Sequence, residues 1–345
     1  MKQFRVGLVG FGSSAKTFHL PLLKALNQDF SITAVVDRKG EDSRRLVPEA
    51  SIFPSWETLV ESPLIDVAVI CLPNGLHAEV ATRFLKAGKH VIVEKPMANT
   101  THETEALIRQ AVASSRLLSV FQSRRLDGDY LTVADLVHSE ALGRLVHVEV
   151  RYDRWSNTLR KKAWKETGQE GDSLLEDLGS HLLDQALHLF GKPRALSCRL
   201  GVQRDGSAVV DAFRISLDYS GLWVDLSSSM VVRRSPFHWA LQGTKGTFLK
   251  SGMDPQEEQL QKRLNPLNEG FGAEPEQLWG VVTDGEGNSH SLPTQRGRYL
   301  GFYQNFAKAL RNEEPLAFTA QEGHEVVHLL EACRRSAREG QVVTL

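Results

Sequence analysis

The sequence lacks the features that mark membrane-spanning, secreted and nucleic-acid-binding proteins. Its 345 residues carry a formal net charge of −1, so no positive excess favours nucleic acid or an anionic membrane as partner. No apolar run approaches the roughly 18–20 residues that span a bilayer. A strand pattern begins at Phe4, which leaves no room for a signal peptide. These absences predict a cytoplasmic protein without a membrane partner.

Cysteine is also scarce. Cys71, Cys198 and Cys333 are odd in number and far apart, which fits reduced thiols and argues against a disulfide framework or a zinc site. The remaining composition, 41% hydrophobic and 24% charged, is that of an ordinary globular protein. A chain of this length exceeds one ordinary core, so one large or two medium domains are expected.

The first third of the chain alternates short apolar runs with helical patterns. Strands are expected at 4–10, 31–37, 66–73 and 90–93, and helices at 15–26, 56–62 and 77–87. Strands and helices at this spacing predict a doubly wound α/β sheet.

A glycine-rich loop follows the first strand. Gly10 closes that strand, Gly12 lets the backbone approach a pyrophosphate, and Ala15 stands where the helix packs on the strand. Ser13 and Ser14 add hydroxyl donors at the helix N-terminus, where the dipole favours a phosphate. The alternative is a tight turn in a sheet that binds nothing. The order of strand, loop and helix favours dinucleotide binding.

An acid ends the second strand. Asp37 lies 27 residues after Gly10, near where a ribose-binding carboxylate is expected. Its charge would accept hydrogen bonds from ribose hydroxyls and repel a 2′-phosphate, which favours NAD. Arg38 is either a solvated loop charge or a partner for that phosphate. NAD is therefore the expected cofactor, with NADP left open.

A charged pair, Glu94 and Lys95, ends the strand at 90–93. Ligands of open α/β sheets bind beyond the carboxyl ends of the strands, where Asn74 also lies. A lysine there can donate to the substrate oxygen that becomes a carbonyl and stabilise a developing alkoxide. Glu94 would bond the ribose or fix Lys95. The alternative is a solvated ion pair at a strand end.

A second polar constellation lies on an amphipathic helical pattern that begins at Leu174 and ends near Gly191. Asp177 and His181 are four apart and share one face. Three interpretations compete: a core histidine satisfied by hydrogen bonds, a metal site without an obvious third ligand, and general acid–base catalysis by an imidazole that titrates near neutrality. No metal is expected.

Several stretches together resemble the Gfo/Idh/MocA oxidoreductases, which are NAD(P)-dependent dehydrogenases of sugars, inositols and related polyols. They are GFGSSAKTFHLP, CLPNGLHAEVA, GKHVIVEKPMA and EDLGSHLLDQALHLFG. The later stretches FQSRRLDGDY, LQGTKGTFLKSGMDPQEEQL and FYQNFAKAL are similar to a subgroup that includes scyllo-inositol dehydrogenases. The resemblance runs essentially from end to end.

The resemblance implies a Rossmann domain at 1–122 and a substrate-binding α/β domain at 123–345, with C-terminal helices that can pack back on the first. The second domain would hold a large, open, mostly antiparallel sheet, which commonly makes a homodimer or homotetramer. The Lys95–Pro96 peptide bond would be cis. Catalysis would fall to Lys95, Asp177 and His181, with the proton acceptor either Lys95 or His181.

The expected ligand-binding residues follow from the same resemblance and from the strand-end argument. Residues expected to bind the cofactor are Gly10, Gly12, Ser13, Ser14, Asp37, Arg38, Pro73, Asn74, His77, Glu94, Lys95 and Gln122. Residues expected to bind the substrate are Lys95, Arg124, Trp164, Asp177 and His181.

Some positions allow two interpretations or depart from the family pattern. Arg124 and Arg125 either reach substrate hydroxyls or brace the turn between domains, and Trp164 either stacks on a sugar face or anchors a loop. Ser123 stands where the family often has Asn. The sequence EGD at 170–172 replaces the family's three glycines, whose backbone freedom Asp172 lacks.

The rest of the chain supplies the second domain. Strand-like alternation covers 195–203, 211–219, 222–232 and 237–250, a hairpin turns around 284–288, and helices are expected at 299–310 and 321–339. The expected activity is oxidation of a secondary hydroxyl, with scyllo- or myo-inositol preferred as substrate. Alternatives are another aldose or a trans-dihydrodiol, and a dinucleotide sensor without turnover.

Overall fold

The computed structural model describes residues 3–159 and 173–345. Contacts divide the chain into two compact units that each combine several stretches of sequence. The first unit comprises 1–126, 255–272 and 298–325, and the second comprises 127–254, 273–297 and 326–345. The predicted division at 122/123 stays a prediction.

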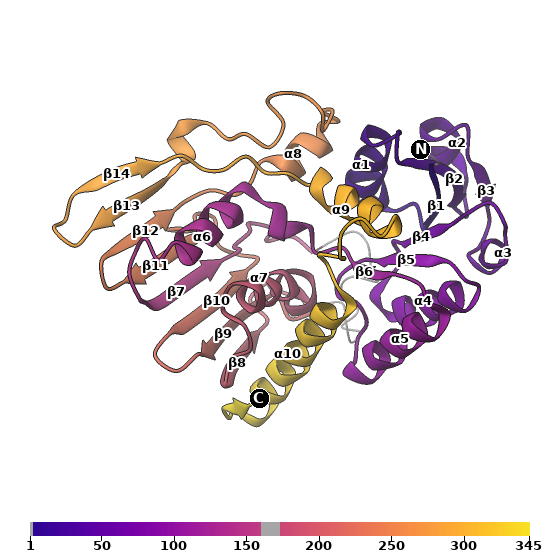
Figure 1. Cartoon of the computed structure of the whole chain (residues 1–345). Coiled ribbons are helices and arrows are strands. Elements are labelled where there is room, and N and C mark those ends of the chain that lie inside the picture. The colour runs from indigo at the N-terminus through magenta and orange to yellow at the C-terminus, as the bar shows by residue number, and fades with distance from the viewer. Residues whose placement is uncertain (1–2, 160–172) are drawn as a thin grey trace. The chain divides into compact units, whose positions relative to one another are not determined.

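The first unit is built on a six-stranded parallel sheet with the order β3-β2-β1-β4-β5-β6 (Figure 1). Its central strands are short, Val- and Ile-rich and mostly buried on both faces, as in other parallel sheets, whereas the edge strand β3 is partly exposed. The strands are β1 (Phe4–Val9), β2 (Phe30–Val36), β3 (Ser51–Phe53), β4 (Val67–Ile70), β5 (His90–Val93) and β6 (Leu118–Val120).

Helices cover both faces of this sheet. Val6, Leu8 and Val69 pack with apolar residues of α1 and α9 in one core, and α4 packs beside α5. The helical elements of the unit are η1 (Ala15–His19), α1 (Leu20–Ala25), α2 (Glu41–Leu46), α3 (Glu57–Val60), η2 (Asn74–Leu76), α4 (His77–Lys86), α5 (Thr101–Ser114), η3 (Ser123–Leu126), α8 (Gln256–Gln261) and α9 (Leu300–Leu310).

The second unit is built on a nine-stranded sheet with the order β14-β13-β12-β11-β7-β10-β9-β8-β15. The β7–β10 pair is parallel and the other neighbours are antiparallel. The strands are β7 (Leu145–Arg151), β8 (Ala195–Gly201), β9 (Ala212–Asp218), β10 (Trp223–Ser229), β11 (Trp239–Gly243), β12 (Gly246–Lys250), β13 (Gly280–Asp284), β14 (Ser289–Leu292) and β15 (Val343–Thr344).

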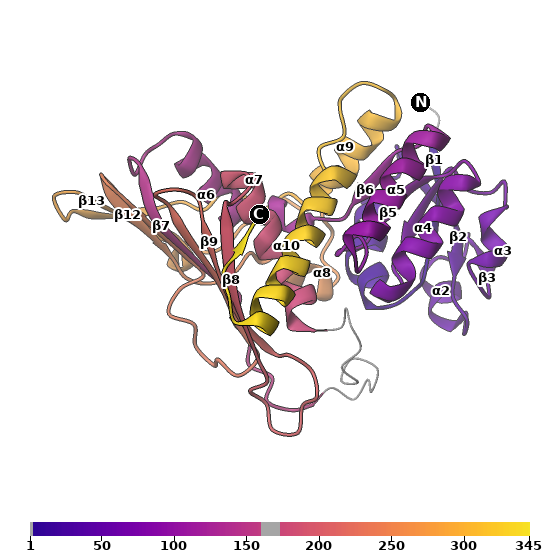
Figure 2. The ribbon, with the colours of Figure 1, turned by 90° about the horizontal axis from the view of Figure 1, so that it is seen from below.

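Helices pack on one face of this larger sheet, as Figure 2 shows for α6 and α7. Alternate strand residues such as Val148 and Leu226 join the helices in one core, while their neighbours Glu149 and Asp225 point to the other face. The helical elements are α6 (Gly128–His138), η5 (Leu175–Gly179), α7 (Ser180–Phe190), η6 (Glu276–Leu278) and the C-terminal part of α10 (Ala320–Glu339).

The predicted fold class is confirmed: a parallel Rossmann-type sheet is followed by a mostly antiparallel sheet. One detail was wrong. The alternating stretch 237–250 is not one strand but the hairpin of β11 and β12, because Thr244 and Lys245 form a turn between them. The elements α2, β3, α5, α6, α8 and β15 were not foreseen. Among the described residues, no helix has the length and hydropathy to span a bilayer.

Candidate active site

The glycine loop lies at the carboxyl ends of β1 and β4. Gly10 has a φ of +100°, and a Cβ there would lie 2.6 Å from the Cys71 carbonyl oxygen, so the fold itself requires glycine. A Cβ on Gly12 would meet no atom of the described chain within 4 Å. Gly12 and Ser13 are exposed. The open space beside Gly12 fits a cofactor phosphate that approaches the backbone.

The carboxylate of Glu94 meets this loop. The Ser14 hydroxyl donates to Glu94 Oε1, and His19 Nε2 lies 3.1 Å from the same oxygen. The backbone N–H of Lys95 donates to Oε2 at 3.2 Å. Burial raises the pKa of Glu94, but the hydrogen bond and charge of His19, the Ser14 hydroxyl and the Lys95 charge outweigh it and lower the pKa to about 2. Glu94 is therefore a carboxylate at neutral pH.

His77, the first residue of α4, holds the turn that follows β5. The Lys95–Pro96 peptide bond is cis, which confirms that expectation. His77 is fully buried, with Nδ1 2.9 Å from the Pro96 carbonyl oxygen and Nε2 2.9 Å from that of Leu72. Burial lowers the pKa of His77, although the two carbonyls favour the protonated ring. His77 thus ties the ends of two strands together.

The other predicted cofactor residues lie along the same edge of the sheet. Pro73 is exposed and Asn74 begins η2. Both follow β4, whose carboxyl end neighbours that of β5.

The carboxylate of Asp37 is engaged at the start of α2. Its Oδ2 accepts from the Ser43 hydroxyl at 2.8 Å and its Oδ1 from the Lys39 N–H at 3.2 Å. Burial raises the pKa of Asp37, but these bonds and others from nearby backbone amides lower it below its usual range. Arg38 is exposed. The remaining lone pairs of the carboxylate still allow it to accept from a ribose.

Gln122 gives a further test of whether these residues fit a cofactor. It follows β6 and is 3% exposed, yet neither atom of its side-chain amide has a hydrogen-bond partner among the described residues. Buried amides are rarely left unsatisfied in a folded chain. An unsatisfied amide at the carboxyl end of β6, together with the space at Gly12, fits a dinucleotide bound along this edge.

The second unit presents the predicted acid–base pair. Asp177 is half-buried in η5, and His181 is 8% exposed in the first turn of α7. The neighbouring Glu176 is buried and accepts from Arg334 Nη1 at 2.8 Å, which anchors this turn to α10. Among the described residues, no group of three or more His, Cys, Asp and Glu side chains could hold a metal ion.

The segment that carries Asp177 has an unusual backbone. Both η1 and η5 are π-helical turns that lead directly into α-helices. Such turns are rare in α-helices and often mark functional sites. One of them contains Asp177, and the other contains His19 and follows the glycine loop.

The arginines after β6 make ion pairs inside the first unit. Arg124 is 6% exposed and donates to the Glu257 carboxylate and, at 3.1 Å, to the Tyr299 hydroxyl. Arg125 donates to Glu322 at 2.7 Å. These contacts brace segments of one unit, and the expected substrate contact of Arg124 stays a prediction. Trp164 and the residues 170–172 lie outside the described residues.

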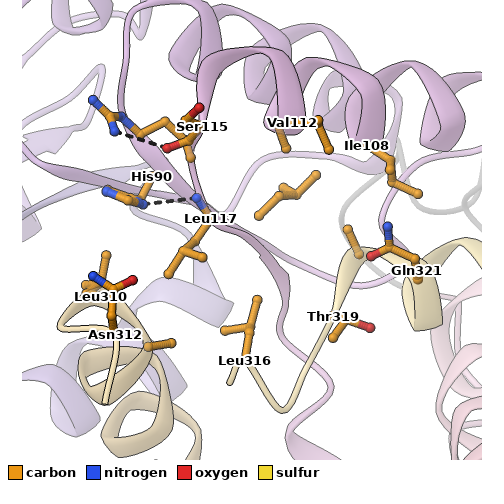
Figure 3. A pocket seen from close by; sticks show the side chains of 15 residues that line it. His90, Ile108, Val112, Ser115, Leu117, Leu310, Asn312, Leu316, Thr319 and Gln321 are labelled. Carbon is orange, nitrogen blue, oxygen red and sulfur yellow. Dashed lines mark hydrogen bonds between the residues drawn. The ribbon is translucent and has the colours of Figure 1, made fainter. Parts of the chain in front are cut away.

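A cavity of about 570 Å³ opens elsewhere in the first unit (Figure 3). It lies at the amino ends of β5 and β6, where His90 Nδ1 accepts from the Leu117 N–H at 3.0 Å. Burial and the charge of Arg116 lower the pKa of His90 to about 4. This cavity is therefore at the opposite end of β5 from Lys95 and is separate from the candidate cofactor site.

Comparison with known proteins agrees with this geometry. Residues 4–122 match the Gfo/Idh/MocA oxidoreductase family, NAD-binding Rossmann fold, and residues 134–345 match its C-terminal alpha/beta domain. The chain belongs to the Gfo/Idh/MocA family. It is therefore an oxidoreductase that uses NAD(P), as predicted, and the resemblance read from its motifs is confirmed.

Relatives of this family member include enzymes with named substrates. The chain is 33% identical to scyllo-inositol 2-dehydrogenase (NADP(+)) IolW of Bacillus subtilis, over 99% of this chain and 96% of that protein. It is 29% identical to levoglucosan dehydrogenase of Pseudarthrobacter phenanthrenivorans, over 58% and 54%. The solved structure of YvaA from Bacillus subtilis covers 100% of this chain and 99% of its own, with 32% identity and a TM-score of 0.96.

Two residues of the site were missed in the sequence. His19 and Tyr303 are both fully buried and form a hydrogen-bonded chain that ends on Glu94. The signal for His19 was a histidine flanked by the apolar residues Phe18 and Leu20 shortly after the glycine loop. Nothing in the sequence around Tyr303 connects it with the first strands of the Rossmann domain.

Proposed function

We propose that this oxidoreductase oxidises a secondary hydroxyl of a cyclic polyol or sugar, with scyllo- or myo-inositol as the preferred substrate class. The observation that carries the proposal is the position of Lys95. It follows β5 directly, and its neighbour Glu94 bonds Ser14 of the glycine loop. A primary amine thus lies near Glu94, next to the loop that we propose to bind the cofactor.

In the proposed reaction, the chain positions the substrate and moves one proton. His181 takes the proton of the reacting hydroxyl, since an imidazole can accept it near neutral pH. Lys95 donates a hydrogen bond to the oxygen and stabilises the charge that develops there. Asp177 holds neighbouring substrate hydroxyls. A nicotinamide cofactor, held by the glycine loop and the residues that follow β4, β5 and β6, would supply the redox chemistry as a hydride acceptor.

Two relatives support a polyol or sugar as substrate. The 33% identity to a scyllo-inositol 2-dehydrogenase extends over nearly the whole of both chains and favours inositols. The shorter match to a levoglucosan dehydrogenase favours the alternative of another sugar. Because hydroxyl stereochemistry is read by a few loop positions, identity at this level supports the class more strongly than one isomer.

The test is the absorbance of reduced nicotinamide when the purified protein meets scyllo-inositol, myo-inositol, levoglucosan and a set of aldoses, with NAD and NADP in parallel. Reduction with an inositol supports the preferred substrate. Reduction with a sugar alone supports the alternative. If none of these compounds reduces the nicotinamide although the cofactor binds, the proposal is contradicted.

We further propose a homodimer or homotetramer that buries one face of the nine-stranded sheet. No helix of the described residues packs on that face, which is called the helix-free face below. On that face Leu249 pairs directly with Val281, and they are 46% and 41% exposed. Trp223 of β10 is 65% exposed. Apolar side chains grouped on a sheet face favour burial against another surface.

A further inference from the structure

A buried hydrogen-bonded chain connects three segments of the first unit that are distant in sequence. The Tyr303 hydroxyl of α9 lies 2.6 Å from His19 Nδ1, and His19 Nε2 lies 3.1 Å from Glu94 Oε1. Tyr303 and His19 are both 0% exposed. Aromatic rings surround them, with Phe121 4.3 Å from the His19 ring between centroids.

The chemistry of the two ends sets the direction of these bonds. A carboxylate only accepts, so Nε2 of His19 carries the proton that lies toward Glu94. Burial raises the pKa of Tyr303 well above its usual value, so the hydroxyl keeps its proton. That hydroxyl lies 2.6 Å from His19 Nδ1. The chain therefore links Tyr303 to His19 and ends with His19 Nε2 donating to Glu94.

The other contacts of Glu94 are with the glycine loop and with Lys95. Its Oε1 accepts from Ser14 of the glycine loop, and its Oε2 accepts from the backbone of Lys95. The Lys95 charge also lies near enough to stabilise the carboxylate. Glu94 thus connects the buried chain with the cofactor loop and with the proposed catalytic amine.

We propose that His19 and Tyr303 are positioning residues that act on Lys95 through Glu94. They hold the carboxylate in one place, and the carboxylate then fixes the backbone and the electrostatic surroundings of the amine. This inference rests on the role proposed for Lys95. Apolar side chains would fill this core at a smaller desolvation cost, so the polar chain points to a task beyond packing.

The test measures the amine itself and needs no substrate. Acetic anhydride acylates exposed, unprotonated lysines, and peptide mass spectrometry gives the rate at Lys95, with Lys89 at the other end of β5 as internal reference. Glu94→Gln removes the negative charge that lies near the amine. We expect Lys95 to react about threefold to tenfold faster in this variant, which is the effect of one charge a few Å away at a partly exposed site.

The positioning residues are tested by coupling. His19→Leu and, separately, Tyr303→Phe are expected to change the Lys95 rate about twofold or more, because the carboxylate is released from its place. In a Glu94→Gln background the same substitutions should have no further effect, since they act through the carboxylate. Tyr303→Phe removes one hydroxyl only and serves where His19→Leu does not fold, as judged by circular dichroism.

The matched control is Tyr130→Phe. The Tyr130 side chain is buried and its hydroxyl lies 2.6 Å from Nδ1 of the exposed His188, so this variant also breaks a Tyr–His bond, in the second unit. It should leave the Lys95 rate unchanged. The inference is overturned if His19→Leu and Tyr303→Phe leave the acylation rate of Lys95 unchanged. It is also overturned if they change that rate by the same factor in the wild-type and the Glu94→Gln backgrounds. If no substrate of the panel reduces the nicotinamide but the effects of these substitutions still depend on Glu94, only the proposed function is overturned.

Discussion

Lys95 is the residue on which the proposed chemistry depends most directly. Lys95→Ala removes the charge that stabilises the alkoxide, so turnover should fall by about 10²–10⁴, the usual contribution of a positioned acid–base group. The dissociation constant for NAD(P) should change less than about threefold, because the glycine loop and Asp37 remain. Initial rates and calorimetric titration measure the two quantities.

Lys89→Ala is the control for this prediction. Lys89 precedes β5 and its Nζ donates to the Ser62 carbonyl at 3.0 Å, far from the carboxyl end of the strand. Turnover of this variant should stay near that of the wild type. A Lys95→Ala enzyme that keeps more than about a tenth of wild-type turnover would contradict the assignment.

Asp37 governs the expected preference between the two cofactors. A carboxylate near the ribose repels a 2′-phosphate, and Arg38 beside it can pair with that phosphate. Asp37→Ser should therefore shift the ratio of NAD to NADP affinity toward NADP by about tenfold, as measured by titration with each. Asp42→Ser removes a nearby carboxylate that is paired with Lys16 and should not shift the ratio.

If Asp37→Ser leaves the ratio of NAD to NADP affinity unchanged, the carboxylate serves only to organise the start of α2. Its bonds to Ser43 and Lys39 already show that it organises the start of α2. The 33% identical relative is named as an NADP(+) enzyme. The titrations with NAD and NADP therefore decide between the NAD preference expected from Asp37 and an NADP preference.

At the scale of single elements, α5 shows how local sequence fixes a boundary. The Thr100 side chain accepts from the Glu103 N–H at 3.2 Å, and the Glu103 carboxylate accepts from the Thr100 N–H at 3.0 Å. This reciprocal pair is a capping box, which satisfies two backbone donors at the helix start. Such a start can be read from the sequence, because both partners lie within one turn.

Thr100→Ala should lower the free energy of unfolding by about 1 kcal/mol, the usual cost of losing an N-cap side chain. The midpoint of urea unfolding, followed by circular dichroism, measures the change. The control is His102→Ala, which shortens an exposed side chain in the same first turn without touching the cap. Equal midpoints for the two variants would contradict the role of the cap.

The elements also show which sequence predictions succeed. The strands β1, β4 and β5 and the helix α4 were predicted within a few residues, because continuous apolar runs and a 3.6-residue period identify them. The short elements α2 and β3 were missed, since three to six residues hold too few periods. The turn between β11 and β12 was missed because Thr244 and Lys245 are not typical hairpin residues.

At the scale of the whole molecule, the helix-free face of the nine-stranded sheet predicts association. The wild-type protein should be a dimer or a tetramer by light scattering after size exclusion. Leu249→Glu with Val281→Glu places charges on the apolar part of that face and should yield a smaller species. Val112→Glu, at a 73% exposed apolar residue of α5, is the control and should not change the mass.

A wild-type monomer, or an unchanged mass in the Leu249→Glu, Val281→Glu variant, would contradict an interface on this face. Circular dichroism of each variant separates lost association from lost folding, because both substituted side chains point away from the core formed by Phe248 and Val282.

The sequence by itself determined the fold class, the glycine loop and the strand that presents Glu94 and Lys95. These features depend on residues close together in the chain, where periodicity and turn chemistry act. Only the tertiary structure brought Tyr303 onto His19 across 284 residues, and His19 onto Glu94 across 75. Those contacts depend on how α9 and η1 pack against the sheet, and packing over such distances leaves no local pattern in the sequence.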